Sequence, residues 1–127
     1  MDRCLNYSEL CRMMTGHEWD FFTACCEVRK QGIYCLDFAL EELDLDKLLI
    51  LRENYLAVNA ISCRLDFRGD ASGRVADLLK MAYLAGAEKV IPSVPEEDAP
   101  ETAAVNAAGL FRLQHALKEL GVDLVMP

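Results

Sequence analysis

The sequence predicts an α/β fold in which repeated strand–helix units build a parallel sheet. At four places a helical pattern ends in Gly or Asn, which suit the left-handed turn that closes a helix. A short apolar run without strict alternation follows each of them, as expected for strands covered on both faces. Strands that alternate with helices in this way form a parallel sheet with right-handed crossovers. The four apolar runs are residues 33–36, 56–61, 89–91 and 122–126.

The N-terminal part of the chain predicts a weaker strand at residues 3–8 and then the first helix. This helix is expected to open at Thr15 or Gly16, because Trp19, Phe22 and Cys26 then recur along its side. Lys30-Gln31-Gly32 ends it before the run at residues 33–36.

Two further helices are expected on either side of the run at residues 56–61. Asp44 or Asp46 opens the shorter one, which continues through apolar leucines to Glu53-Asn54. Ser72 is a suitable N-cap for the next helix, which ends at Gly86. One stripe of that helix carries Val75, Leu78, Leu79 and Ala82.

The last helix has the clearest signals. Pro100 occupies the place of a first-turn proline, and Glu101 complements the positive end of the helix. Leucines recur at three- and four-residue steps before Gly121, and the final run at residues 122–126 follows. The acidic segment at residues 95–100 is interpreted as a loop, so residues 1–127 are expected to form a single domain.

Two architectures fit this order of elements. A five-stranded doubly wound sheet of the flavodoxin type has about the right size, although its last helix would be missing. A (β/α)8 barrel needs about 250 residues, about twice this length. Because the sequence stops at Pro127 directly after an apolar strand, we favour a partial barrel with four βα units and a fifth strand.

Composition and charge exclude several classes of partner. Hydrophobic residues make up 53% of the chain, which is typical of a globular protein. A net charge of −8, from 13 basic and 21 acidic residues, disfavours nucleic acid and anionic membrane surfaces. No signal peptide or membrane span is expected, and no Cys-x-x-Cys pair occurs. We therefore expect six reduced cysteines, mostly in the core, and a cytoplasmic protein.

Residues at the carboxyl ends of the predicted strands are the candidates for a site, because parallel α/β folds bind ligands there. Asp37 is the candidate catalytic residue, since an acid in an apolar strand needs a partner or a task; pairing with Arg64 is the alternative. A carboxylate and a histidine on one rim could transfer a proton next to a carbonyl. The candidate substrate-binding residues are His17, Glu18, Ser62, Ser93 and Glu96.

Several segments resemble the sugar phosphate isomerase/epimerase family, the xylose-isomerase-like TIM barrels. They are Leu43–Leu48, Tyr55–Cys63, Leu78–Pro92 and Ala108–Leu124, in the order of that family's first four βα units and fifth strand. The resemblance implies a metal-dependent isomerase or epimerase that acts on a sugar, sugar phosphate or polyol. In such an enzyme a divalent cation (Mn²⁺, Mg²⁺, Zn²⁺ or Co²⁺) polarises a carbonyl while carboxylates shuttle a proton.

The family's metal ligands are not carried over to this chain. The place of the first metal-binding glutamate falls on Pro127, and Ser62 or Cys63 replaces a histidine frequent at the third strand. Asp37 matches an acidic position common at the second strand. We therefore expect no cofactor in this chain, and no activity until a C-terminal half is supplied. The alternatives are a non-catalytic half-barrel that forms a homodimer and a flavodoxin-like binder of small ligands.

Overall fold

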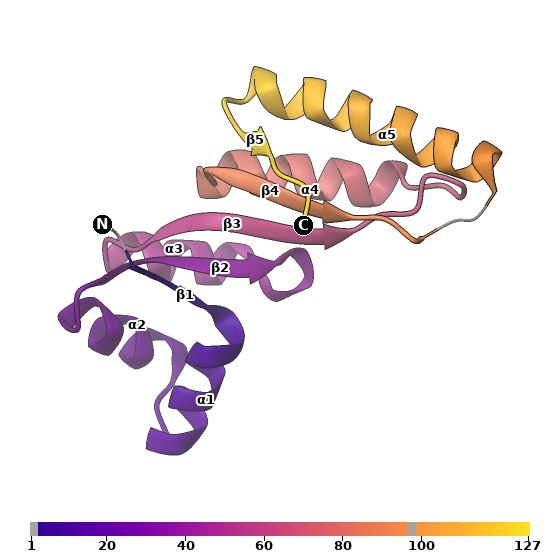
Figure 1. The fold of residues 1–127 in the computed structure, drawn as a ribbon. Coiled ribbons are helices and arrows are strands. Elements are labelled where there is room, and N and C mark those ends of the chain that lie inside the picture. The colour runs from indigo at the N-terminus through magenta and orange to yellow at the C-terminus, as the bar shows by residue number, and fades with distance from the viewer. Residues whose placement is uncertain (1–2, 97–98) are drawn as a thin grey trace.

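Five parallel strands form one sheet and follow each other in chain order, as Figure 1 shows. The computed structural model describes residues 3–96 and 99–127, so Glu97 and Asp98 of the acidic loop lie outside it. The strands are β1 (Arg3–Asn6), β2 (Ile33–Ala39), β3 (Ala57–Arg64), β4 (Lys89–Ser93) and β5 (Asp123–Leu124). This sequential order confirms the partial barrel. The flavodoxin-like alternative is wrong, because that fold places β1 between β2 and β3.

Helices cover one face of the sheet and leave the other face open (Figure 1). The sheet is not closed, since β1 and β5 each pair with one neighbour among the described residues. No helix of the described residues has the length and apolarity needed to cross a membrane. The helices are α1 (Tyr7–His17), α2 (Phe21–Lys30), the short 3₁₀ helix η1 (Leu40–Glu42), α3 (Leu45–Glu53), α4 (Ser72–Ala85) and α5 (Pro100–Glu119).

The hydrophobic core lies between the sheet and these helices. Leu36, Ile61 and Val90 point from the strands into this layer and are fully buried. Leu78 of α4 and Leu117 of α5 meet them from the helical side and are also fully buried. The open face carries the hydrogen-bonded side chains of Asp37 and Asn59, so this surface of the sheet is partly polar.

The N-terminal region contains two helices, whereas the sequence predicted one that starts at Thr15 or Gly16. Asn6 caps α1 by accepting a hydrogen bond from the Glu9 backbone N–H at 2.9 Å, and its amide donates to the Glu9 carboxylate at 2.6 Å. The first bond satisfies a backbone N–H that has no partner inside the helix, and the second, which comes from the Asn6 side chain, holds the Glu9 carboxylate beside the cap. Asp20 then caps α2 by accepting from the Thr23 N–H at 2.8 Å.

Other helix ends agree with the sequence only in part. Asp44 caps α3, and Pro100 occupies the first turn of α5, as predicted. Ser72 is not the N-cap of α4: it lies inside the first turn, where Asp70 accepts from its N–H and hydroxyl at 3.0 and 2.6 Å. After α3, Tyr55 with φ 58° takes the left-handed conformation expected at Asn54.

The cysteines differ from the expectation of six reduced thiols. Cys4 and Cys35 form a disulfide between β1 and β2, while Cys11, Cys25, Cys26 and Cys63 are free. Cys25 and Cys63 are buried in the core, and burial raises the pKa of Cys25 to about 12. The pairing arises because the parallel register places Cys4 opposite Cys35, which the spacing of 31 residues does not reveal.

Candidate functional site

The carboxyl ends of four strands surround a cavity of about 190 Å³ on the open side of the sheet. Asp37 and Ser62, both candidates from the sequence, lie in its lining, and β1 contributes a wall from the end of the strand into α1. The lining residues are Asn6, Tyr7, Ser8, Asp37, Phe38, Ala39, Glu42, Ala60, Ser62 and Ile91. We refer to this space as the Asp37 cavity.

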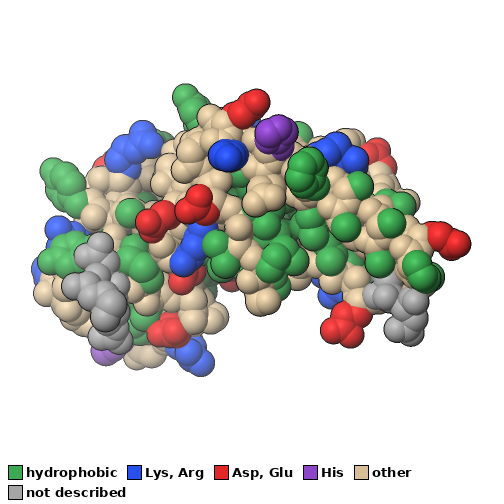
Figure 2. All heavy atoms as spheres, turned by 45° about the horizontal axis from the view of Figure 1, so that its top comes forward, with side chains coloured by type: hydrophobic (Ala, Val, Ile, Leu, Met, Phe, Trp, Pro, Cys, Tyr) green, Lys and Arg blue, Asp and Glu red, His purple; other side chains and the backbone are tan. Residues whose placement is uncertain are grey.

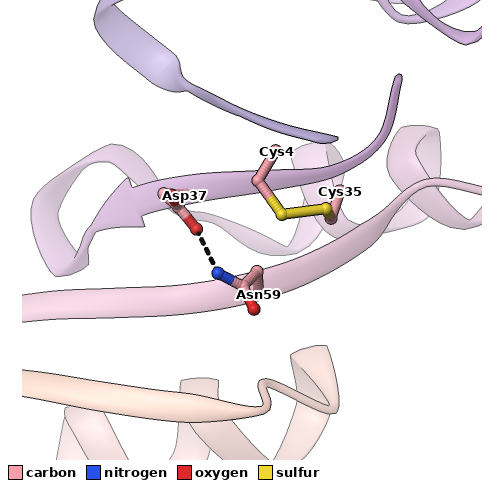
Figure 3. The surroundings of a disulfide bond; sticks show 4 residues. All are labelled: Cys4, Cys35, Asp37 and Asn59. Carbon is pink, nitrogen blue, oxygen red and sulfur yellow. Dashed lines mark hydrogen bonds between the residues drawn. A yellow bond between two sulfur atoms is a disulfide. The ribbon is translucent and has the colours of Figure 1, made fainter. Parts of the chain in front are cut away.

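Asp37 is half-buried and has one described hydrogen-bond partner from the neighbouring strand. The Asn59 side-chain amide donates to the Asp37 carboxylate at 2.9 Å, as Figure 3 shows, so the partner is Asn59 and not Arg64. The pairing of β2 with β3 steps from Leu36–Val58 to Asp37–Ala60 and thereby leaves Asn59 as an extra residue. Such a bulge re-aims side chains, and here it turns the Asn59 amide toward Asp37.

Aromatic and charged groups form the wall next to Asp37. The ring of Tyr7 packs on that of Phe38 with centroids 5.2 Å apart, and the Lys47 ammonium lies 5.1 Å from the Tyr7 centroid. Glu42 accepts a hydrogen bond from the Ala39 N–H at 2.7 Å and so fastens η1 to the end of β2. The cavity thus combines a carboxylate, amides and hydroxyls with an aromatic side.

Tyr7 is expected to remain protonated far into the alkaline range. Burial, then contacts with Cys11, Glu42 and Asp44, raise the pKa of Tyr7 to about 12. Because this folded-state pKa lies above the ordinary value of 10, the free energy of unfolding is unaffected by Tyr7 below pH 10 and falls between pH 10 and 12. Spectrophotometric titration should show a phenol that ionises near pH 12 and disappears in Tyr7→Phe. Loss of a component near pH 10 instead would contradict this assignment.

The other candidates lie outside the Asp37 cavity. His17 and Glu18 are at the far end of α1, where His17 stacks on Trp19 with centroids 4.2 Å apart. Ser93 ends β4, and its carbonyl accepts from the Leu65 N–H at 2.8 Å. Glu96 is exposed in the loop after β4. Therefore the structure brings Asp37 and Ser62 together but not these four.

Asn6, Tyr7 and Glu42 belong to the cavity although the sequence did not nominate them. The strand predicted for residues 3–8 hid the turn from β1 into α1, which brings Asn6 and Tyr7 to the rim. The spacing Asn6-x-x-Glu9 is the signal that could have located this turn. Nothing in the sequence pattern distinguishes Glu42 from its neighbour Glu41.

Asp66, near the start of the loop that follows β3, is held by a neighbouring arginine. The Arg68 guanidinium donates to both Asp66 carboxylate oxygens at 2.8 and 2.6 Å. This paired contact holds the pKa of Asp66 to about 2. Its carboxylate therefore serves to shape the loop after β3.

The described residues do not suit a divalent metal ion. No group of three or more His, Cys, Asp or Glu side chains gathers in residues 3–96 and 99–127 in a way that could hold one. Within the Asp37 cavity the acidic side chains are Asp37 and Glu42, and Glu42 is already bound to the Ala39 N–H. A complete set of metal ligands would need side chains beyond these residues.

Solved structures with the same arrangement of strands and helices clarify what the open sheet represents. A sugar phosphate isomerase/epimerase from Parabacteroides distasonis is similar with a TM-score of 0.72 and 12% identity, over 98% of this chain and 50% of that one. This chain has the fold of half such a protein. The IolI protein, solved with a bound zinc atom, is similar with a TM-score of 0.65 and 14% identity, over 99% of this chain and 51% of that one.

In a third solved structure, too, this chain covers about half of the matched chain. A protein from Sinorhizobium meliloti 1021 is similar with a TM-score of 0.64 and 19% identity, over 97% of this chain and 49% of that one. No protein-family model and no curated protein matches the sequence. The chain spans about half the length of the structures it matches, so the expected half-barrel is confirmed as a fold.

Proposed function

We propose that residues 1–127 form the N-terminal half of a sugar isomerase or epimerase whose remaining strands lie in the same polypeptide. Asp37 would take part in proton transfer on a sugar, sugar phosphate or polyol, and Ser62 would bind one of its hydroxyl groups. His17, Glu18, Ser93 and Glu96 remain candidates for substrate contacts made only in the complete protein.

The sequential order of the strands around the Asp37 cavity carries this proposal. In a closed barrel of parallel strands the carboxyl ends form the binding face, and here four of those ends surround the cavity that contains Asp37. At about 190 Å³ the cavity is smaller than the roughly 300–1,000 Å³ typical of sites for small molecules. A cavity of this size suits one wall of a site that further strands would complete.

The chemistry of the lining supports a polyhydroxylated ligand. The Asp37 carboxylate accepts hydrogen bonds, the hydroxyls of Ser8 and Ser62 both donate and accept, and the Asn6 amide does the same. Tyr7 and Phe38 provide an apolar side for the carbon skeleton. Because the described residues do not suit a metal, this chain's part is confined to binding the ligand and moving a proton at the Asp37 carboxylate.

Deuterium incorporation tests the proposal. The complete polypeptide should exchange the hydrogen next to the carbonyl of its sugar in D₂O, as followed by NMR, whereas residues 1–127 alone should not. Asp37→Asn in the complete protein should slow the exchange by about 10²–10⁴-fold, the usual contribution of a general acid or base. The exposed Asp77 on α4 provides the matched control Asp77→Asn, which should leave the rate unchanged.

Three results would contradict the proposal. The first is full exchange activity in the Asp37→Asn variant of the complete protein. The second is turnover by residues 1–127 alone, and the third is a rise in their melting temperature on addition of Mn²⁺, Mg²⁺, Zn²⁺ or Co²⁺.

A non-catalytic half-barrel that self-associates is the second candidate function. Open strand edges tend to associate, and apolar side chains lie exposed near β5 and on α5. Figure 2 shows hydrophobic side chains gathered on the face that carries α5. The exposed residues are Val105, Phe111, Leu120, Val125 and Met126. This candidate predicts a mass by light scattering of twice 14.2 kDa or more, and a stable monomer would contradict it.

A further inference from the structure

The disulfide between Cys4 and Cys35 joins β1, an outer strand of the described sheet, to the neighbouring strand β2. It links β1 to β2 on the open face, on the same side of the sheet as Asp37 and Asn59 (Figure 3). Cys4 and Cys35 are direct partners in the register of the two strands. The covalent bond therefore holds in place a strand that has no second neighbour in the described part of the chain.

Strand β1 has few other ties to the sheet. It is four residues long, and its pairing with β2 is irregular between Arg3 and Cys4. Leu5 is its buried anchor in the core, while Asn6 is exposed. Short outer strands with one neighbour open more readily than central ones, so the bond should matter most for β1.

Small molecules can reach the bond from the open face. Cys4 is half-buried, and both cysteines line a wide cavity of about 690 Å³ near the amino ends of the strands. The charged side chains in that lining are Lys89 and Glu88. Cys35 is also buried, with 7% of its surface exposed, so Cys4 is the half of the bond that solvent reaches, whereas Cys25 and Cys63 are buried and do not line this cavity. A thiol in solution thus has a path to this pair.

The register connects the bond to the Asp37 cavity. Two residues beyond the cysteines, Asn6 of β1 pairs with Asp37 of β2, and Tyr7 and Ser8 follow directly in the chain. All four residues line the Asp37 cavity. A displacement of β1 would consequently move one wall of this cavity relative to the carboxylate.

We propose that the Cys4–Cys35 disulfide is a reversible redox modification site that clamps β1 to β2 and keeps the Asp37 cavity assembled. The reductant is a small thiol of the glutathione class or a dithiol. Its thiolate attacks one sulfur and breaks the S–S bond, and a second thiol then resolves the mixed disulfide. Two protons and two electrons pass to the protein, which gains two Cys–SH groups, and the reductant leaves as a disulfide. The idea that this bond regulates activity rests on the proposed function. The effect of the bond on the position of β1 does not, because it needs no substrate.

Hydrogen exchange followed by mass spectrometry tests the clamp in the oxidised and dithiothreitol-reduced chain. Reduction should raise the exchange rates of the Leu5 and Asn6 amides by tenfold or more and leave those of Val58 and Ile61 in β3 within twofold. Alkylation after denaturation should count four thiols in the oxidised chain and six in the reduced one. Equal exchange of β1 in both forms, or six thiols in protein equilibrated with oxidised glutathione, would overturn the proposal.

Substitutions separate the bond from general effects of the reductant. Cys4→Ser should show fast β1 exchange with and without dithiothreitol. Cys26→Ser is the matched control, since its hydroxyl can replace the thiol that donates to the Asn54 side chain at 2.9 Å, and it should respond to reduction as the unchanged chain does. If Cys4→Ser does not fold, the comparison of hydrogen exchange between the oxidised and the reduced form of the unsubstituted chain still tests the proposal. These readouts involve no sugar, so a failure of the clamp is distinct from a failure of the proposed function.

Discussion

Gly109→Ala is expected to lower the free energy of unfolding by about 1–3 kcal/mol, the usual cost of overpacking. Gly109 is buried on the inner side of α5, and a Cβ atom there would overlap the ring of Phe67 from the loop after β3. The Asn106 side chain accepts from the Phe67 N–H at 2.8 Å, so the loop cannot shift without losing that bond. Urea unfolding of the variant measures the loss.

Gly73→Ala provides the matched control for this substitution. Gly73 lies in the first turn of α4, and a Cβ there would meet nothing within 4 Å. Alanine has the better helix propensity, so this change should be neutral or stabilising by up to about 1 kcal/mol. Phe67→Ala combined with Gly109→Ala should cost less than the sum of the two single changes. An unaffected Gly109→Ala variant would show that Phe67 does not pack on α5 as described.

Leu36→Ala is expected to cost about 2–5 kcal/mol, as truncation of a buried leucine usually does. Leu36 is 0% exposed in the middle of β2 and directly precedes Asp37, so the void left by its side chain would lie in the core, across the sheet from the candidate site. The midpoint of urea unfolding should fall while the slope remains unchanged, since the surface exposed on unfolding stays nearly the same.

The exposed leucine on α3 supplies the control for Leu36. Leu49 is 57% exposed, and Leu49→Ala should change the free energy of unfolding by no more than about 0.5 kcal/mol. Similar losses at both positions would contradict the placement of the core between β2 and the helices. Together the two variants test whether burial, and not the leucine itself, determines the cost.

The sequence predicts the alternation of strands and helices because that information is local. The helix closed by Gly86 and the proline start at Pro100 follow from the conformations that these residues favour. Local patterns gave the wrong helix start where two signals in the sequence compete. The weak apolar run at residues 3–8 hid the cap at Asn6. Ser72, expected to accept a capping bond, instead donates its N–H to Asp70 from inside the first turn of α4.

Features that depend on pairing between distant segments were beyond local patterns. The order of the strands distinguishes a barrel from a flavodoxin-like sheet, yet both contain the same alternation along the chain. The Cys4–Cys35 bond and the Asn59–Asp37 contact also depend on the register between neighbouring strands. Of the candidate site, Asp37 and Ser62 could be found because each directly follows a predicted apolar run, while Tyr7 and Glu42 emerged only from the fold.

Reading the native reading frame beyond the codon for Pro127 tests the central claim most directly. The open edges of β1 and β5, with the half-length match to the solved structures, predict that the frame continues for roughly another half-barrel. Glu, Asp and His should then follow successive predicted strands, where they could supply the metal ligands that residues 3–96 and 99–127 lack. A stop codon directly after Pro127 would contradict the account and favour the self-associating half-barrel.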